Sequence, residues 1–498
     1  MRKLFLLLGC VCGMSSLYSQ QNRSVLDVNW SKVNSVSKTI STLQLVENPM
    51  VRPGSTIHKQ TFAALKELGA DYVRYVPWFP YPKMAVAELR PPTKDSTFWD
   101  FTYLDSTMAA FMEATKGHSV VINFSTTPAW MWVTTNNGAA TNPHVYPENP
   151  YQTDWDYNQG KQLKDTTFRE LAGYYSRLFS WYTKGGFTDE LGKFHKSGHY
   201  YHIPYWEVLN EPDLEHNIDA ETYTRIYDVI VKALKKVSPG TKFIGMSLAF
   251  ATNPHYFEYF LNAKNHLPGV VPEGISYHFY GTPSWEDQEL SGYRYTFFEK
   301  ADAFLDRVRF IESIRKRLAP GTFTTINEIG TILRGPQVFK PIDPNYWNLS
   351  GAMYAYICLQ LTKQGIDVAG ESQLVGYPSQ FPDVSMMNWE NGKPNARYWV
   401  LWLLHGHFAP GDRLVETGFK NGLPSGLIAQ AMMTKSGKKI LLINTGPTAI
   451  EFAIPSSETG GTLTAVDATS GDDEPQAKPV TDTLIALKPF AVAVLQLK

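Results

Sequence analysis

Two glutamates, Glu211 and Glu328, are placed where they could act together as a pair of carboxyl groups. Glu211 follows the strand-like run 204–209, and Glu328 follows the strand-like run 322–327. If the fold brings them close, one protonated and one ionised carboxyl can cleave a glycosidic bond through a covalent intermediate, which requires a separation of about 5 to 5.5 Å. The alternative interpretation is that each glutamate only ends a strand in a surface ion pair.

One pair of carboxyls can serve both halves of such a reaction. A carboxylic acid donates a proton at neutral pH only if its pKa is raised, which burial or a nearby negative charge can achieve. Beside an ionised Glu328, Glu211 is held protonated. Once Glu328 has become an ester, Glu211 can instead take a proton from water. The sequence therefore predicts Glu211 as the acid/base and Glu328 as the nucleophile.

Segments typical of helices and strands alternate around the two glutamates. Phe62, Leu65 and Leu68 have helical spacing, and Gly69 can end their helix before the next strand. Eight such units predict a TIM (β/α)8 barrel, whose active site lies at the carboxyl ends of the strands. An open doubly wound sheet is the alternative, but the Gly-rich phosphate turn that it predicts after an early strand is missing. The predicted strands are 39–46, 71–76, 119–124, 204–209, 242–247, 274–279, 322–327 and 367–372.

A change of pattern after Pro410-Gly411 predicts a second, smaller domain. Short strand-like runs separated by Gly, Pro, Ser and Asp indicate an all-β, sandwich-like domain, to which residues 21–38 could return to pair. Its predicted strands are 427–433, 439–444, 449–454, 462–466 and 491–497. The predicted organisation is a signal peptide at 1–20, a catalytic barrel at 21–408 and the β domain at 409–498.

The first residues have the layout of a secretory signal. A basic start at residues 1–3 precedes an apolar segment at 4–8 and small residues, with cleavage expected near Gln20. The segment is too short to span a bilayer, so the predicted location is secreted or periplasmic. The run 7–10 also resembles a bacterial lipobox, which would attach a lipid to Cys10 and give an outer-surface lipoprotein.

Composition excludes several other functions. Lys and Arg total 46 against 47 Asp and Glu, which leaves no excess of positive charge for nucleic acid. The 12 histidines form no His-Glu-x-x-His motif, and after cleavage Cys358 is the one remaining cysteine, expected to be a packing residue, so no metal site or disulfide is predicted. There is no Gly-x-Ser-x-Gly motif either, and no cofactor is implied. The sequence carries no signal for oligomeric state.

The residues around Glu211 and Glu328 resemble those of clan A retaining glycoside hydrolases. In that clan an Asn-Glu-Pro glutamate ends the fourth barrel strand as acid/base and the nucleophile ends the seventh, which matches Asn210-Glu211-Pro212 and Glu328. Residues 206–213 and the C-terminal β domain most resemble family 39, which includes β-xylosidases and α-L-iduronidases, although Leu209 stands where that family often has tryptophan. The resemblance implies retaining hydrolysis of O-glycosides, on β-xylosides or related glycans.

Four further residues are expected to assist the pair. Asn210 has a side chain suited to binding the sugar 2-hydroxyl, or it could only cap a turn. The resemblance of the segment 276–280 to the clan implies that Tyr280 donates to Glu328 and that His278 touches the substrate or the acid/base. A buried histidine without a catalytic part is the alternative for His278. Arg74 would keep Glu328 ionised by its fixed positive charge, unless it forms a plain ion pair on the rim.

Aromatic residues are the remaining candidates for substrate binding. The chain has 13 Trp, 27 Tyr and 27 Phe, and flat rings can stack on sugars, although core packing accounts for most of them. The candidates follow predicted strands and are Trp78, Trp130, Trp285 and Trp389. The expected partner is an oligosaccharide or polysaccharide. The competing hypothesis is a non-catalytic carbohydrate-binding protein on the same barrel, which would have no need for both glutamates.

Overall fold

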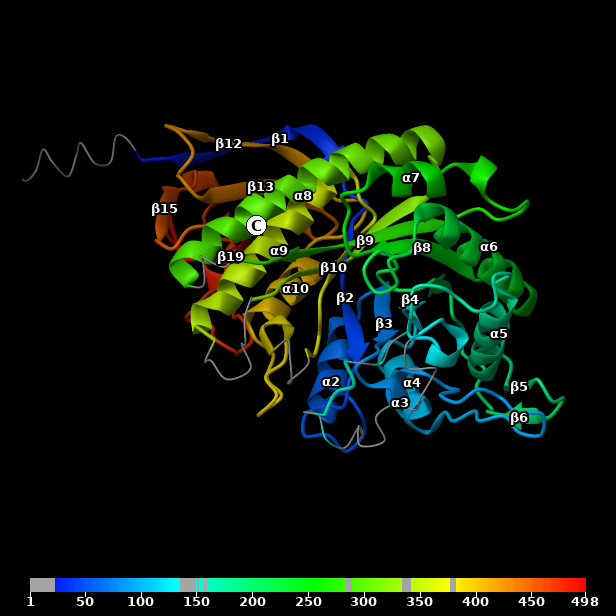
Figure 1. The fold of residues 1–498 in the computed structure, drawn as a ribbon. Helices are drawn as coiled ribbons and strands as arrows, with labels where there is room; N and C mark the ends of the chain where they lie inside the picture. The colour runs from blue at the N-terminus through cyan, green and yellow to red at the C-terminus, as the bar shows by residue number, and fades with distance from the viewer. Residues whose placement is uncertain are drawn as a thin grey trace, which may run out of the picture.

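The computed structural model describes residues 23–134, 149, 152–155, 157, 159–283, 289–333, 342–376 and 382–498. Eight parallel strands close into a barrel, which confirms the predicted TIM barrel (Figure 1). They are β2 (Ile40–Glu47), β3 (Val73–Pro77), β4 (Val120–Ile122), β7 (Tyr205–Glu207), β8 (Lys242–Leu248), β9 (Gly274–Gly281), β10 (Phe323–Thr331) and β11 (Val368–Glu371). The predicted signal peptide, Cys10 and Trp285 lie outside the described residues.

Helices connect the strands and bury their apolar faces against them. In the first of them Phe62, Leu65 and Leu68 are buried, and Gly69 ends the helix in the left-handed conformation at φ 60°. Within the described ranges every helix is too short or too polar to cross a lipid bilayer. The helices are α2 (His58–Leu68), α3 (Pro82–Ala85), α4 (Thr102–Ala114), α5 (Arg169–Thr183), α6 (Ala220–Val237), α7 (Pro254–Phe260), α8 (Leu290–Leu318), α9 (Pro344–Gln364) and α10 (Ala396–His407).

The predicted strands 119–124 and 204–209 both end two residues earlier than expected. The strand β7 stops at Glu207 rather than at 209, because Leu209 and Glu211 adopt left-handed backbone conformations, at φ 62° and 43°, that cannot continue a strand. The helix α7 ends at Phe260, and Asn262 then accepts a hydrogen bond from the backbone of Lys264 and begins a short 3-10 turn. The stretch before β7 also contains a hairpin of β5 (Gly186–Thr188) and β6 (Phe194–Lys196).

The C-terminal part is all-β, as predicted, but it forms one continuous sheet rather than two stacked ones. Nine strands join in a mostly antiparallel half-barrel around an apolar core. The first strand comes from the N-terminal segment and pairs with β12, as the blue and orange ribbons in Figure 1 show. The strands are β1 (Val25–Val36), β12 (Arg413–Lys420), β13 (Leu427–Thr434), β14 (Gly437–Asn444), β15 (Ile450–Ala453), β16 (Thr462–Val466), β17 (Lys478–Pro479), β18 (Leu484–Leu487) and β19 (Val492–Gln496).

Candidate active site

A cavity of about 640 Å³ lies at the carboxyl ends of the barrel strands. Its lining includes residues from several strands that are far apart in the chain, so the fold brings together most of the side chains singled out in the sequence. The predicted site residues on its wall are Trp78, Asn210, Glu211, His278, Tyr280 and Glu328. Arg74 lies beneath them and is fully buried.

Irregular backbone aims the two glutamates at the cavity. Glu211 lies beyond the end of β7, and its backbone N–H donates to the carbonyl of Ser247 at 2.9 Å. In β10 the strand register shifts between Thr325 and Glu328, which is the signature of a bulge. As a result, the consecutive side chains of Asn327 and Glu328 both reach the barrel interior, where a regular strand would present only one of them.

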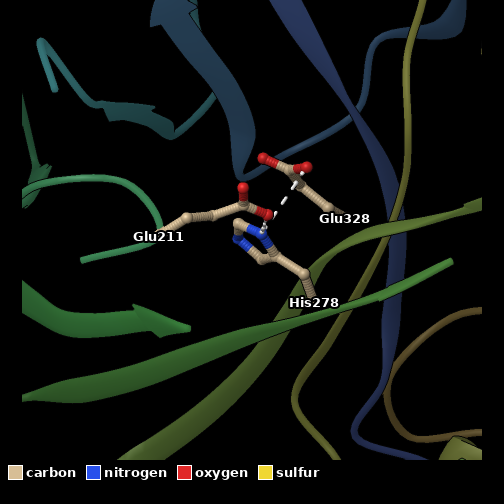
Figure 2. Close-up of side chains that lie close together, drawn as sticks. All are labelled: Glu211, His278 and Glu328. Atoms are coloured by element: carbon tan, nitrogen blue, oxygen red, sulfur yellow. Dashed lines mark hydrogen bonds and ion pairs between the residues drawn. The ribbon is translucent and has the colours of Figure 1, made fainter. Parts of the chain in front are cut away.

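The two carboxyl groups lie next to each other, and the imidazole of His278 lies beside them and contacts both (Figure 2). One carboxylate oxygen of Glu211 and one of Glu328 lie within 4.8 Å of each other. The Nδ1 atom of His278 is 2.8 Å from Glu211 Oε1 and 3.6 Å from Glu328 Oε2. This separation fits the about 5 to 5.5 Å of a retaining pair better than the about 6.5 to 9.5 Å of an inverting pair.

The surroundings raise the pKa of both Glu211 and His278 and so favour their protonated forms. Burial raises the pKa of Glu211, and the nearby charge of Glu328 adds to the shift, while the hydrogen bond with His278 opposes it. Burial alone would lower the pKa of His278, but the two carboxylates outweigh it and raise the pKa. Glu211 is thus the member of the pair that is suited to carry a proton to a leaving group.

Arg74 holds the other glutamate from below. Its Nη1 donates to Glu328 Oε1 at 2.6 Å, and its Nη2 donates to Asn210 Oδ1 at 2.7 Å. The phenol of Tyr280 donates to the second oxygen of Glu328 at 2.6 Å. Both contacts agree with the roles expected for Arg74 and Tyr280, since a fixed cation and a donor favour an ionised carboxylate.

A third carboxylate, Glu207, was not predicted to belong to the site. It is buried and accepts four hydrogen bonds, which come from the side chains of Arg74, Asn123, Ser276 and Asn327. Although burial opposes it, the charge of Arg74 lowers the pKa of Glu207, and the hydrogen bonds add to this effect. The signal that could have identified Glu207 is an acidic residue inside an otherwise apolar strand.

Glu215, one helical turn after Glu211, also escaped prediction. Its Oε1 accepts from Asn210 Nδ2 at 2.9 Å and from Trp78 Nε1 at 2.8 Å. Burial, together with the charge of Glu211, raises the pKa of Glu215 to about 8, so its carboxyl is largely neutral at pH 7. The amide of Asn210 is therefore fixed at both ends, by Arg74 and by Glu215.

The structure does not bring all the candidate tryptophans to the cavity. Trp130 is buried, and its indole N–H donates to the carbonyl of Glu88 at 2.9 Å, which makes it part of the loop packing. Trp389 packs partly buried against the barrel core, away from the cavity wall. Of the candidate tryptophans within the described ranges, only Trp78 lies on that wall, whereas Phe250, which was not predicted, lies there with 53% of its surface exposed.

Glu211, His278 and Glu328 are also close enough together to ligate a metal ion. Their present contacts favour a hydrogen-bonded cluster instead. The Nδ1 atom of His278 that would bind a metal is in contact with Glu211, and the guanidinium of Arg74 already supplies positive charge at Glu328. These contacts suit acid/base chemistry.

Comparison with solved structures shows the same fold in several glycosidases. No protein-family model and no curated protein sequence matches this chain. The family 51 α-L-arabinofuranosidase of Thermotoga petrophila RKU-1 superposes with a TM-score of 0.60 at 16% identity, over 95% of this chain and 100% of that one. The family 39 β-xylosidase of Caulobacter crescentus gives 0.59 at 15% identity, over 95% and 99%.

A structure from a third family is nearly as similar. The family 30 endoxylanase of Clostridium papyrosolvens C71 gives a TM-score of 0.56 at 13% identity, over 95% of this chain and 100% of that one. At these identities the comparisons establish a shared fold and do not single out family 39.

Proposed function

We propose that this chain is a retaining glycoside hydrolase that cleaves O-glycosidic bonds by double displacement. The observation that carries the proposal is the facing pair of Glu211 and Glu328, whose nearest oxygens are within 4.8 Å and whose environments differ. Glu328 is bound by Arg74 and Tyr280, whereas the pKa of Glu211 is raised. Two carboxyls with such different surroundings are suited to be a nucleophile and an acid.

In the first half of the reaction, a carboxylate oxygen of Glu328 attacks the anomeric carbon while Glu211 gives its proton to the glycosidic oxygen. The bond between that carbon and oxygen breaks, and the leaving group departs as an alcohol. Glu328 is now an ester and has lost its charge, so the pKa of Glu211 falls. In the second half, Glu211 takes a proton from water, the water oxygen attacks the anomeric carbon, and Glu328 is released as a carboxylate.

The proposed substrates are β-xylosides or related glycans that contain pentoses. The names of the similar structures support this class, because they describe an α-L-arabinofuranosidase, a β-xylosidase and an endoxylanase. The resemblance of residues 206–213 and of the C-terminal β domain to family 39 also supports it. The basic and apolar start of the sequence supports export of the enzyme from the cytoplasm.

A panel of activated aryl glycosides tests the proposal. The wild type should release the aryl group from at least one member, and its rate should fall as the pH rises through the raised pKa of Glu211, because only the protonated acid can assist departure. Glu328→Ala should abolish turnover, and added azide should restore only formation of the glycosyl azide with inverted configuration. Glu258→Ala, an exposed carboxylate on α7, is the control.

The outcomes separate the proposal from its rival. Binding of sugars by the wild type without release of the aryl group from any glycoside would identify a carbohydrate-binding protein. Activity of Glu328→Ala equal to that of the wild type would remove Glu328 from the nucleophile role.

A further inference from the structure

Besides the residues around the two carboxyls, the cavity wall includes residues of α8 and of the segment after β8, and this part of the cavity is called the lobe below. Its wall includes Phe250 and Thr252 from the segment after β8, and Lys300, Ala303, Phe304 and Arg307 from α8. The four α8 residues are spaced by three, four and seven positions, so they form one face of the helix. The catalytic chemistry described above uses none of these side chains.

Backbone hydrogen bonds connect the segment that carries Phe250 to the segment that carries Glu211, the proposed acid. Asp213, two residues after Glu211, accepts hydrogen bonds from the backbone N–H groups of Ala249 at 2.9 Å and Phe250 at 3.0 Å. Together with the bond from Glu211 to Ser247, this fastens the segment carrying Phe250 to the segment carrying Glu211. Because the acid protonates the glycosidic oxygen, the leaving group lies on its side of the bond. The lobe is therefore on the leaving-group side.

Phe250 gives the lobe a flat apolar surface. Its side chain is 53% exposed and makes no ring contact with the described residues. The rings of Phe279 and Phe304, which also line the cavity, stack with their centroids 4.7 Å apart. An exposed ring beside a polar cavity is suited to stack on the C–H face of a sugar.

Arg307 gives the lobe an available cation. In the described part of the chain it has no hydrogen bond or ion pair, whereas Arg309, Arg315 and Arg317 on the same helix pair with Asp306, Glu312 and Glu258. Lys300 adds a second positive charge on the wall, and Glu299 adds one negative charge. A guanidinium presents a planar set of donors that matches a carboxylate.

We propose that this lobe is a leaving-group subsite for a uronic acid, whose ring stacks on Phe250 and whose carboxylate binds Arg307. The inference rests on the proposed glycosidase function and extends it from the bond that is cleaved to the sugar that leaves. It assigns to Arg307 a role in substrate specificity and to Phe250 a role in binding the leaving sugar.

Two matched disaccharides test the subsite. Both carry the sugar that the aryl-glycoside panel identifies, and they differ only in the leaving sugar, which is glucose in one and glucuronic acid in the other. The wild type should hydrolyse the glucuronic acid compound with a kcat/KM higher by about tenfold, the size expected of one charge-assisted hydrogen bond. Arg307→Gln should remove this preference, and Phe250→Ala should lower kcat/KM for both disaccharides more than for the aryl glycoside.

Neighbouring residues supply matched controls. Arg309→Gln and Phe310→Ala change residues on α8 that are exposed and do not line the cavity, and both should keep the wild-type preference. Equal kcat/KM of the wild type for the two disaccharides, or a preference that survives in Arg307→Gln, would overturn the subsite while aryl-glycoside activity leaves the proposed function intact. A wild type that hydrolyses no aryl glycoside would refute the proposed function, and the subsite with it.

Discussion

Two buried Arg–Glu pairs in the same barrel differ in the pKa of their carboxyl group. Arg74 pairs with Glu207 through Nε at 2.5 Å, and Arg397 pairs with Glu371 through Nε at 3.0 Å. Glu207 accepts four hydrogen bonds, and its pKa is lowered. Glu371 has Arg397 on one oxygen and no partner for the other in the described structure, and burial raises its pKa to about 8.

The difference teaches that a neighbouring arginine does not by itself keep a buried carboxylate ionised. The cost of removing the charge from water exceeds what one ion pair returns, so additional donors decide the result. Beneath the cavity these donors are present, and Arg74 extends the ionised network to Glu328. Around Arg397 the remaining partners are the backbone carbonyls of Ser372 and Val384, which indicates a structural role.

The largest effect is expected when each arginine is replaced by methionine. Arg74→Met leaves Glu207 and Glu328 buried without their cation, so we expect a loss of about 3 to 5 kcal/mol in the free energy of unfolding. Its kcat should fall by about 10²- to 10³-fold, because the charge that keeps the nucleophile ionised is gone. Arg397→Met removes hydrogen bonds from a carboxyl that is already largely neutral, so it should lose less stability, about 1 to 3 kcal/mol, and keep kcat within about tenfold of the wild type. Urea denaturation and aryl-glycoside kinetics measure both quantities.

Arg74→Lys provides a second test in case Arg74→Met does not fold. Lysine keeps the charge but cannot reach Glu207, Glu328 and Asn210 at once, so it should recover stability more than kcat. If Arg397→Met and Arg74→Met lowered kcat to the same extent in folded protein, the distinction between a functional and a structural pair would be wrong.

The sequence was sufficient to predict the barrel and the proximity of Glu211 and Glu328. Eight apolar strands between amphipathic helices specify the closed sheet, and strand order alone places Glu211 and Glu328 at one end of it. The all-β character of the second domain was equally readable. Its division into sheets was not, since a single curved sheet and two stacked ones share the same alternation of apolar and polar residues.

The rest of the site depends on features that leave little trace in local sequence. Asn327 and Glu328 both face inward only because of a bulge, which is a property of strand pairing. Glu215 joins the site through hydrogen bonds with Trp78 and Asn210 that form only in the folded chain. Trp130 and Phe250 illustrate the same limit, because which aromatic residue is buried and which lies on the cavity wall is decided by loop packing.

A smaller effect should distinguish Glu207 from Glu371 by the pH dependence of stability. The neutral carboxyl of Glu371 suits the fold, so between its unfolded pKa near 4.5 and its folded pKa of about 8 the folded state binds more protons, and stability falls as the pH rises. Glu371→Gln should remove this contribution and gain stability relative to the wild type at pH 8, with little change at pH 5. Glu207 has a lowered pKa and contributes stability above pH 4.5 that is lost in acid.

Glu207→Gln should therefore be less stable than the wild type at pH 7, and the difference should shrink as the pH falls. Urea denaturation at pH 5, 6.5 and 8 measures the difference for Glu371→Gln. The difference for Glu207→Gln is measured at pH 7 and at pH values below about 4.5, where its contribution is lost. If the free energy of unfolding changed with pH in the same way for the wild type and Glu371→Gln, Arg397 would keep Glu371 ionised. The proposed difference in pKa between Glu207 and Glu371 would then be wrong.

The smallest effect is expected at Tyr280, which links the Arg74 network to the Arg397 network. Tyr280 donates to Glu328 and lies 2.5 Å from the hydroxyl of Ser372, whose backbone carbonyl accepts from Arg397. Tyr280→Phe removes one donor from a charged nucleophile that Arg74 still holds, so kcat/KM should fall by about tenfold with little loss of stability. Tyr277→Phe is the matched control, because this buried phenol on the same strand has no hydrogen-bond partner in the described structure and should be replaceable without loss of activity. A loss in Tyr280→Phe as large as that in Arg74→Met would mean that the phenol, rather than the guanidinium, decides the charge of Glu328.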